Sequence, residues 1–176
     1  MNSSSTLLSL ILLLVCSSVW GMAHAQGGGL DNIRFYMYET DAGNPDATVF
    51  DVVPPLQGGN TTFGIIRMFD NTLGDGPYPS NSTLLGRFQG FIDFTGIGSL
   101  PGKLSVVTFV FTSGKYSGST LVVTGIFQLT DGAIERPIVG GTGVFRMARG
   151  YSLVTVVGKP TPVTTTYEVN LFVDVK

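Results

Sequence analysis

Charged residues are scarce in this chain of 176 residues: only 12% are Asp, Glu, Lys or Arg, and 10 basic residues face 12 acidic ones. A nucleic-acid binder carries a basic excess, so this balance argues against that class. A disordered chain has low hydropathy, whereas 43% of these residues are apolar and the mean hydropathy is +0.33. The composition therefore predicts one folded domain.

Cysteine, tryptophan and histidine each occur once, as Cys16, Trp20 and His24. All three fall in a segment typical of a secretory signal peptide, residues 1–25, which has an apolar run from Leu7 to Val15 and ends on a small-x-small cleavage site. A membrane anchor is the alternative, but the run is too short to span a bilayer. We therefore expect a secreted, extracellular protein.

Cleavage after Ala25 leaves a mature chain without cysteine or histidine. Such a chain cannot build a Ser-His-Asp triad, a cysteine nucleophile, a haem or copper site with those ligands, or a zinc finger. We therefore expect no metal, no cofactor and no oxidase activity. Without disulfides, packing alone has to stabilise the fold, and about 150 residues bury roughly two thirds of the unfolded surface.

The chain after a glycine-rich leader at residues 26–32 is rich in Val, Ile, Thr, Phe and Tyr and is divided by turns of Gly, Pro, Asn and Asp. No segment has a sustained helical period. The pattern predicts one antiparallel all-β domain over residues 33–176. The expected strands are Ile33–Thr40, Phe63–Asp70, Leu84–Phe94, Lys103–Phe111, Thr120–Thr130, Val144–Val157 and Thr165–Val175.

The last expected strand has the clearest period of two. Tyr167, Val169 and Leu171 alternate with polar residues, which is typical of a strand with one face in water. Two middle segments, Val106–Phe111 and Leu121–Phe127, are apolar on both faces. Their second face could meet another subunit.

Seven or more short strands can form either a sandwich or a closed barrel. Closure removes the exposed sheet edges that a hydrophobic secreted protein has to hide. Gly86, Gly90 and Gly125 lie inside expected strands and favour the barrel, because small residues allow the bends that closure needs. An eight-stranded antiparallel β-barrel would have a lumen the size of one small ligand.

Eight segments of the sequence, in order and spacing, resemble the plant dirigent proteins over almost the whole mature chain. The resemblance implies an eight-stranded antiparallel barrel, a homotrimer, secretion to the cell wall and an aromatic ligand. The segments are Phe35-Tyr36-Met37, Asn44-Pro45, Phe63-Gly64, Gly86-Arg87-Phe88-Gln89-Gly90, Phe109-Val110-Phe111-Thr112, Gly114-Lys115-Tyr116-Ser117-Gly118-Ser119-Thr120-Leu121, Val139-Gly140-Gly141-Thr142-Gly143 and Ala148-Arg149-Gly150-Tyr151.

The resemblance also implies a function that is not oxidation. In that family a separate laccase or peroxidase makes phenoxy radicals from monolignols such as coniferyl alcohol, and the barrel orients the radicals or quinone methides so that one stereochemical coupling dominates. Such a protein guides lignan or cell-wall coupling and does not turn over alone. Two alternatives stay open: an acid-catalysed dehydratase or cyclase that uses the same lumen, and a non-catalytic cell-wall or defence protein.

Glu39 is the first candidate catalytic residue. It shares strand parity with Ile33, Phe35 and Met37, so its carboxyl faces the lumen if they do, and burial would raise its pKa. The resemblance supports this role, because the family usually has His-Asp where this chain has Tyr38-Glu39. The alternative is that the strand ends there and the side chain is solvated.

Two polar positions of the family are apolar here. Lignan-forming members typically carry an Asp and an Arg at the positions of Phe127 and Ile134. Arg136, two residues beyond Ile134, and Asp131, of the same parity as Phe127, could partly substitute for them. The resemblance thus makes Asp131 and Arg136 further catalytic candidates, and it leaves stereoselective lignan coupling in doubt.

The remaining candidates concern ligand contact and modification. Tyr36, Tyr38 and Phe127 could form an aromatic wall for a phenol, although core packing is the default role of such residues. Arg149 follows Phe145 and Met147 and could pair with an inward carboxylate or fix the barrel through a salt bridge. Asn60 and Asn81 begin glycosylation sequons. Gly140–Gly143 looks like a phosphate loop, but no helix follows it, so we expect a tight strand connection.

Overall fold

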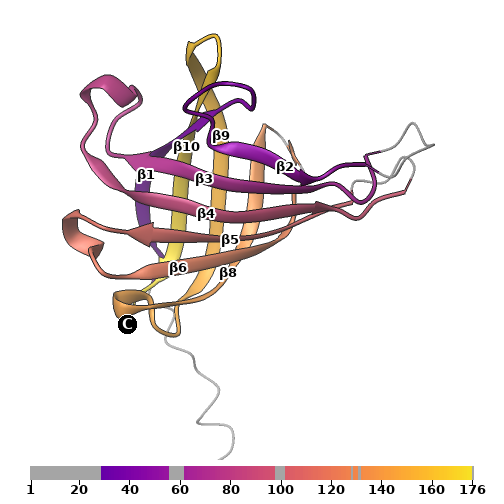
Figure 1. Cartoon of the computed structure of the whole chain (residues 1–176). Helices are drawn as coiled ribbons and strands as arrows, with labels where there is room; N and C mark the ends of the chain where they lie inside the picture. The colour runs from indigo at the N-terminus through magenta and orange to yellow at the C-terminus, as the bar shows by residue number, and fades with distance from the viewer. Residues whose placement is uncertain (1–28, 56–61, 98–101, 128, 131, 176) are drawn as a thin grey trace, which may run out of the picture.

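The computed structural model describes residues 29–55, 62–97, 102–127, 129–130 and 132–175. Figure 1 shows a curved antiparallel sheet that closes on itself. The expected signal peptide, Asn60 and Asp131 lie outside the described residues. Within the described part, no helix is long and apolar enough to cross a membrane.

The barrel has eight strands, which hydrogen-bond in the order β1-β10-β9-β8-β6-β5-β4-β3 and back to β1. A short strand, β2, extends the sheet beyond β3, and β7 pairs with β8. The strands of the described chain are β1 (Asp31–Thr40), β2 (Val49–Val53), β3 (Ile66–Gly74), β4 (Leu84–Phe94), β5 (Lys103–Phe111), β6 (Thr120–Ile126), β7 (Leu129–Thr130), β8 (Ala133–Thr142), β9 (Arg149–Thr161) and β10 (Thr164–Asp174).

The seam that closes the barrel is short. β1 pairs with β10 along ten residue pairs, from Asp31 to Thr40, but with β3 through only three, Tyr36–Tyr38 against Thr72–Gly74. Closure of the sheet decides between the two predicted architectures in favour of the eight-stranded barrel.

Alternation along the strands puts one face of each inside the barrel. Val169, Leu171 and Val173 of β10 are completely buried, as their period predicted. Phe35 of β1 packs edge-on against Phe109 of β5, with ring centroids 5.5 Å apart. Apolar side chains from strands on opposite sides of the barrel thus meet in one core.

Two glycines of β4 allow the neighbouring strand to lie close. A Cβ at Gly86 would overlap the carbonyl oxygen of Val110, and a Cβ at Gly90 would overlap that of Val106. Both acceptors are on β5, which pairs with β4 along its whole length. Side chains at these two positions would push β5 away, so the prediction that they serve closure has a steric basis.

The strand bounds differ from the prediction at several places, and the largest differences concern β2, β8 and β9. β2 and β8 were not among the expected strands, since a run with Pro137 and Gly140 reads as a connection. Residues 143–145 form a short 3-10 helix, η3 (Gly143–Phe145), so the expected strand from Val144 is wrong and β9 begins only at Arg149. The backbone reverses there through Met147, with φ of 64°.

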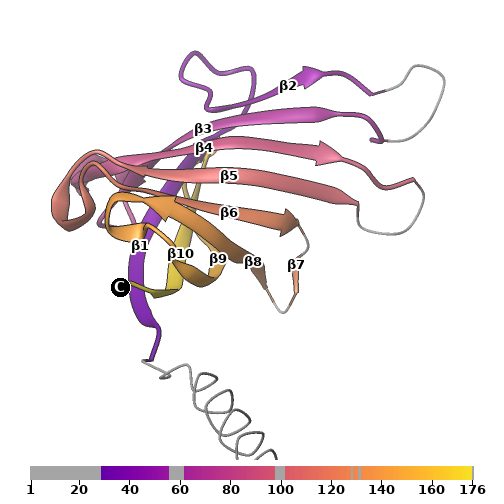
Figure 2. The same cartoon turned by 90° about the horizontal axis from the view of Figure 1, so that it is seen from below.

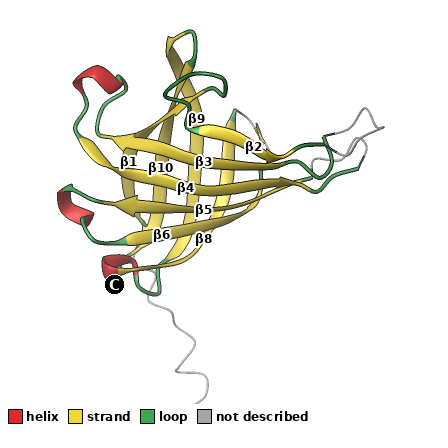
Figure 3. Cartoon of the chain, viewed as in Figure 1, coloured by secondary structure: helices red, strands yellow, loops and turns green. Residues whose placement is uncertain are grey.

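The two ends of the barrel differ. Figure 3 shows η3 and two similar turns, η1 (Pro79–Asn81) and η2 (Gly114–Tyr116), in red at one end. The other end is where β4 and β6 finish and β5 and β8 begin, and β7 lies beside it in Figure 2. We call this second end the mouth, and the polar side chains described next lie toward it.

Candidate functional site

The interior of the barrel contains a cavity of only about 20 Å³ near the mouth. Ligand sites in proteins typically measure about 300–1,000 Å³, so the expected ligand-sized lumen is not open in this structure. Aromatic side chains, among them Phe69, Phe88 and Phe127, line this small cavity together with Arg136. The cavity has room for about one water molecule.

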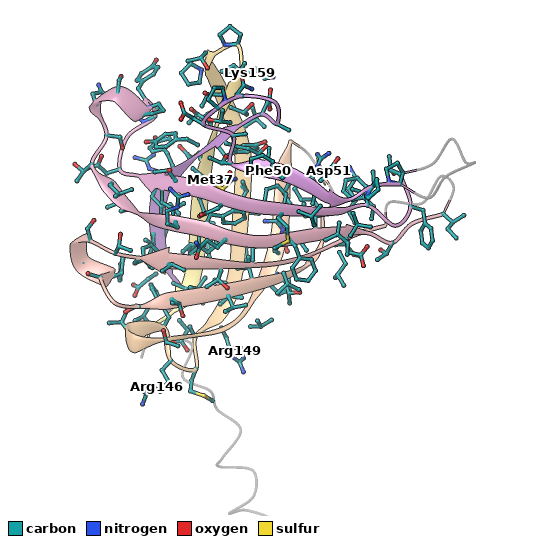
Figure 4. All side chains as sticks on the ribbon, in the orientation of Figure 1. Met37, Phe50, Asp51, Arg146, Arg149 and Lys159 are labelled. Carbon is teal, nitrogen blue, oxygen red and sulfur yellow. The ribbon has the colours of Figure 1, made fainter. Side chains whose placement is uncertain are left out.

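A larger depression of about 470 Å³ lies next to this cavity, outside the closed ring. We call it the mouth groove. It is lined by Glu39, Asp41 and Ala42 at the end of β1, by Val49, Phe50 and Asp51 of β2, and by Arg67 of β3. Figure 4 shows Phe50 and Asp51 on β2. Glu39 lines both spaces, so its carboxyl stands between the buried interior and the accessible groove.

Hydrogen bonds from two strands hold the carboxyl of Glu39. Asn71 Nδ2 on β3 donates to Oε2 over 3.1 Å, and the Tyr167 hydroxyl on β10 donates to Oε1 over 3.2 Å. Asn71 is completely buried, and its Oδ1 accepts a hydrogen bond of 2.6 Å from Thr48 Oγ1. The carboxyl therefore has one fixed orientation, held by a hydrogen-bond network of Thr48, Asn71, Glu39 and Tyr167.

Burial raises the pKa of Glu39 above its ordinary value, while the hydrogen bonds from Asn71 and Tyr167 oppose that rise. The pKa of Tyr167 is also raised, first by burial and then by the neighbouring charge of Glu39. A carboxyl with a raised pKa keeps its proton to higher pH than a solvated one, and the phenol stays a hydrogen-bond donor. The sequence parity placed Glu39 on the inner face, where the structure has it.

Arg136 lies on the inner face of β8 with Ile134, and both side chains line the interior cavity. It is 3% exposed, and its Nε and Nη1 have no hydrogen-bond partner in the part of the chain that the structure describes. Burial lowers its pKa to about 10, so the group still carries a charge at neutral pH. Its guanidinium lies over the ring of Phe127, with the carbon 5.1 Å from the centroid.

Cations and aromatic rings alternate around the mouth. Arg67 lies 5.5 Å from the centroid of Phe94, and Lys103 lies 5.0 Å from the same ring. Lys103 is also 5.8 Å from the centroid of Phe127, which carries Arg136 on its ring. We call these five residues the cation–aromatic row. They come from β3, β4, β5, β8 and the end of β6, so sequence spacing gave no signal for them.

Two of the predicted ligand contacts face away from the interior. The even-numbered residues of β1 point outward, so Tyr36 donates to Glu168 over 3.4 Å and Tyr38 donates to the carbonyl of Gly76 over 2.6 Å. Tyr38 lines a separate outer groove of about 640 Å³ between β1, the η1 segment and the β9–β10 turn. The structure does not bring either tyrosine to the cavity of Glu39.

Arg149 is also outside the barrel. Its Nη1 donates to the carbonyls of Val139 and Ala148, each over 2.8 Å, and no inward carboxylate is near it among the described residues. The η3 turn interrupts the strand alternation by which Arg149 was predicted to share a face with Phe145. Arg149 instead begins β9 on the outer face. Figure 4 shows Arg146 and Arg149 far from Phe50 and Asp51.

The other candidates are placed as follows. Phe127 lines the cavity, as a ligand wall would, but it fills the space as a packed ring. Asn81 is exposed in η1, where a glycan has room. Asn60 and Asp131 are outside the described residues, so their predicted roles stay predictions. The prediction did not include Asn71, although a lone Asn on the inner face of a strand is a signal for a buried polar site.

Residues 30–174 match the sequence model described as Dirigent-like protein. Dirigent protein 1 of Arabidopsis thaliana is 37% identical over 123 residues, which cover 69% of this chain and 66% of that protein. Pterocarpan synthase 1 of Glycyrrhiza echinata is 34% identical over 124 residues, 69% of this chain and 64% of that protein. The chain thus aligns with slightly less than two thirds of these relatives' length.

Two solved structures are similar along most of the fold. The pterocarpan synthase dirigent protein GePTS1 has a TM-score of 0.69 at 30% identity, and the alignment covers 82% of this chain and 83% of that one. The pterocarpan synthase dirigent protein PsPTS1 has a TM-score of 0.68 at 28% identity, covering 84% and 96%. The overall fold is therefore shared with both.

Proposed function

The chain belongs to the dirigent-like protein family, and from this membership we propose that it binds a phenolic compound at the mouth of its barrel and controls the stereochemistry of a bond formed there. The observation that supports this role is the carboxyl of Glu39. It lies between the buried cavity and a groove of about 470 Å³, and burial raises its pKa. A phenolic ring in that groove would lie beside a fixed proton donor.

The chemistry that suits this carboxyl is ring closure on a quinone methide. Protonated Glu39 gives its proton to the quinone methide oxygen while an internal hydroxyl of the substrate adds to the methide carbon. The proton of that hydroxyl then returns to Glu39, so the carboxyl ends as it began. Positioning and proton transfer together determine which face of the methide is attacked. A difference of about 1.4 kcal/mol between the two faces already gives a tenfold excess of one product.

The quinone methide can come from two sources. In the first, a separate laccase or peroxidase oxidises a monolignol-like phenol such as coniferyl alcohol, and two radicals couple within the site. In the second, a hydroxybenzyl alcohol loses water with Glu39 as the acid. The similarity to relatives named pterocarpan synthase, from Glycyrrhiza echinata and Glycine max, favours the second source, because these names describe synthases and mention no oxidase. Phe127 stands where lignan-forming members typically have an Asp, which also favours it.

We propose secretion and self-association on separate grounds. The predicted signal peptide supports export to the apoplast, and the exposed position of Asn81 suits glycosylation in that compartment. On the outer face of the barrel, Leu104, Ile126 and Val139 are 40–46% exposed on three neighbouring strands. An apolar patch of this kind on a secreted barrel suits a contact with further copies of the chain, such as a trimer.

The deciding experiment measures product chirality with two substrates. One arm contains coniferyl alcohol and a laccase; the other contains a racemic hydroxybenzyl alcohol that carries an internal hydroxyl, without oxidant. We expect one enantiomer in excess in at least one arm, and loss of that excess in Glu39→Gln. Glu135→Gln, an exposed Glu on β8, is the matched control. Racemic products in both arms would contradict the proposal and favour a non-catalytic role at the cell wall.

A further inference from the structure

Arg136 brings a positive charge into the barrel, and no carboxylate of the described residues forms an ion pair with it. The side chain is 3% exposed, and Nε and Nη1 lack partners within the described chain. A buried guanidinium normally forms several hydrogen bonds, because leaving its donors unsatisfied is costly. Among the described residues, the head group contacts the ring of Phe127, with the guanidinium carbon 5.1 Å from its centroid. The protein therefore maintains a costly charge at the cavity.

The nearby carboxylates already have partners. Asp51 is held by Arg67 in a two-pronged pair, with distances of 2.5 Å and 3.0 Å. Both oxygens of Glu39 accept from Asn71 and Tyr167. No ion pair to Arg136 is formed among the residues that the structure describes. Neither of these two carboxylates therefore accepts a hydrogen bond from Arg136.

The surroundings favour an anion joined to an aromatic ring. Arg136 and Lys103 both lie over Phe127, so two cations flank a single ring at the inner end of the cation–aromatic row. The cavity beside Arg136 measures about 20 Å³, which has room for one polar atom, such as a single carboxylate oxygen, and for no aromatic ring. The mouth groove, about 470 Å³, has room for the ring. Glu39 lines both spaces and would lie next to the junction between head group and ring.

We propose that the substrate is a phenolic acid and that Arg136 binds its carboxylate, while the phenolic ring lies in the mouth groove next to Glu39. This inference rests on the proposed function and specifies its substrate class. A carboxylate oxygen accepts a charge-assisted hydrogen bond from a guanidinium N–H, which is stronger than the bond that the neutral hydroxyl of an alcohol accepts. Such a pair in this buried cavity would replace the hydration that Arg136 has lost.

The test compares two compounds that differ only in the head group. Ferulic acid and coniferyl alcohol share the same methoxyphenol ring and side-chain double bond. Calorimetry at pH 7 with the full mature protein should give a dissociation constant at least tenfold lower for the acid. In Arg136→Gln the two constants should become equal within threefold, with that for the alcohol unchanged. Arg136→Lys should keep part of the preference. Arg146→Gln, an exposed arginine of the η3 turn, is the control and should behave as the natural protein.

Salt and folding controls make the outcome specific. The preference should persist in 0.5 M salt, because a buried pair is screened far less than surface charges. Circular dichroism should show the same β-sheet content in each variant, and Arg136→Met replaces Arg136→Gln if the latter does not fold.

Three results would overturn the inference. Equal affinity for the acid and the alcohol in the natural protein would do so, as would a preference that survives removal of Arg136. In both cases a stereochemical excess in the chirality assay would leave the proposed function standing. If neither compound binds, the inference and the proposed function fail together.

Discussion

Tyr167 on β10 donates its hydroxyl to Oε1 of Glu39 on β1 over 3.2 Å. Asn71 holds the other oxygen from β3, on the opposite side of β1. The carboxyl is therefore bound to both strands that flank its own. This arrangement ties the proton-donating group to the seam that closes the barrel, and it determines how the site responds to pH.

The raised pKa of Glu39 makes the stability of the barrel depend on pH. A carboxyl with a folded pKa above its ordinary value of 4.5 favours the folded state most when it is protonated. Its contribution is complete below pH 4.5 and is lost as pH rises through the folded pKa. We expect the free energy of unfolding of the natural protein to fall relative to that of Glu39→Gln over this range, as measured by urea denaturation from pH 4 to 8. Glu135→Gln should show the same pH dependence as the natural protein. If the stability of Glu39→Gln changed with pH in parallel with that of the natural protein, the raised pKa would not belong to Glu39.

Tyr167→Phe should shift the pH dependence of activity. The hydrogen bond from Tyr167 lowers the pKa of Glu39, so its removal raises that pKa further. Activity that needs protonated Glu39 falls about tenfold per pH unit above that pKa. The alkaline limb of the pH–rate profile should therefore move to higher pH, while the maximal rate drops because the carboxyl loses its fixed orientation. Tyr151→Phe, which changes a ring stacked on Phe172 outside the barrel, should leave the limb in place. A shift to lower pH would contradict this account.

Arg136→Met should stabilise the unliganded protein. Replacing an unpaired buried cation by an apolar side chain of similar length removes the cost of burying its charge; for whole buried ion pairs, apolar replacement is neutral or gains about 1–4 kcal/mol. We expect a higher free energy of unfolding and a higher melting temperature by calorimetry. Arg146→Met at an exposed position should change stability by no more than about 0.5 kcal/mol. Destabilisation by Arg136→Met would mean that the guanidinium has an anionic partner within the protein.

The outer apolar patch predicts the effect of charge on assembly. Ile126 and Val139 are 46% and 44% exposed on neighbouring strands, β6 and β8. Val139→Lys and Ile126→Lys should convert the oligomer to monomers, as measured by light scattering after size exclusion. Val52→Lys, at a 56% exposed position on β2, should not change the mass. A natural protein that is already monomeric at micromolar concentration would remove the basis for this prediction.

Alternation of apolar residues was enough to predict the β class and the inner face of several strands. It placed Val169 and Leu171 in the core, and it placed Glu39 on the inner face with Phe35. The same parity rule puts Tyr38 on the opposite face from Glu39, so the two could not both reach the cavity. Tyr36 and Tyr38 lie on the outer face, apart from Glu39, so their role as ligand contacts stays a prediction.

Other features depend on contacts between distant strands and leave no local signal. Lys103 and Arg136 meet the same ring of Phe127 only after the barrel has formed. Arg149 was predicted on the same face as Phe145, but the turn at Met147 interrupts the alternation of the strand. No residue type in the sequence indicates this turn. The volume of the cavity depends on the rotamers of packed aromatic rings, which a strand pattern does not contain.

β1 and β3 are joined by only three residue pairs, so we expect this to be the least stable strand pairing of the closed barrel. Neighbouring hydrogen bonds between two strands stabilise one another, so a short strand pairing opens more easily than a long one. Amide hydrogen exchange should therefore be faster at residues 36–38 and 72–74 than at the paired residues of β9 and β10, and equal rates would contradict this. Glu39 directly follows the last of these paired residues on β1, and Asn71 directly precedes the first on β3, so local opening of this boundary would also release the hydrogen bond that holds the acid.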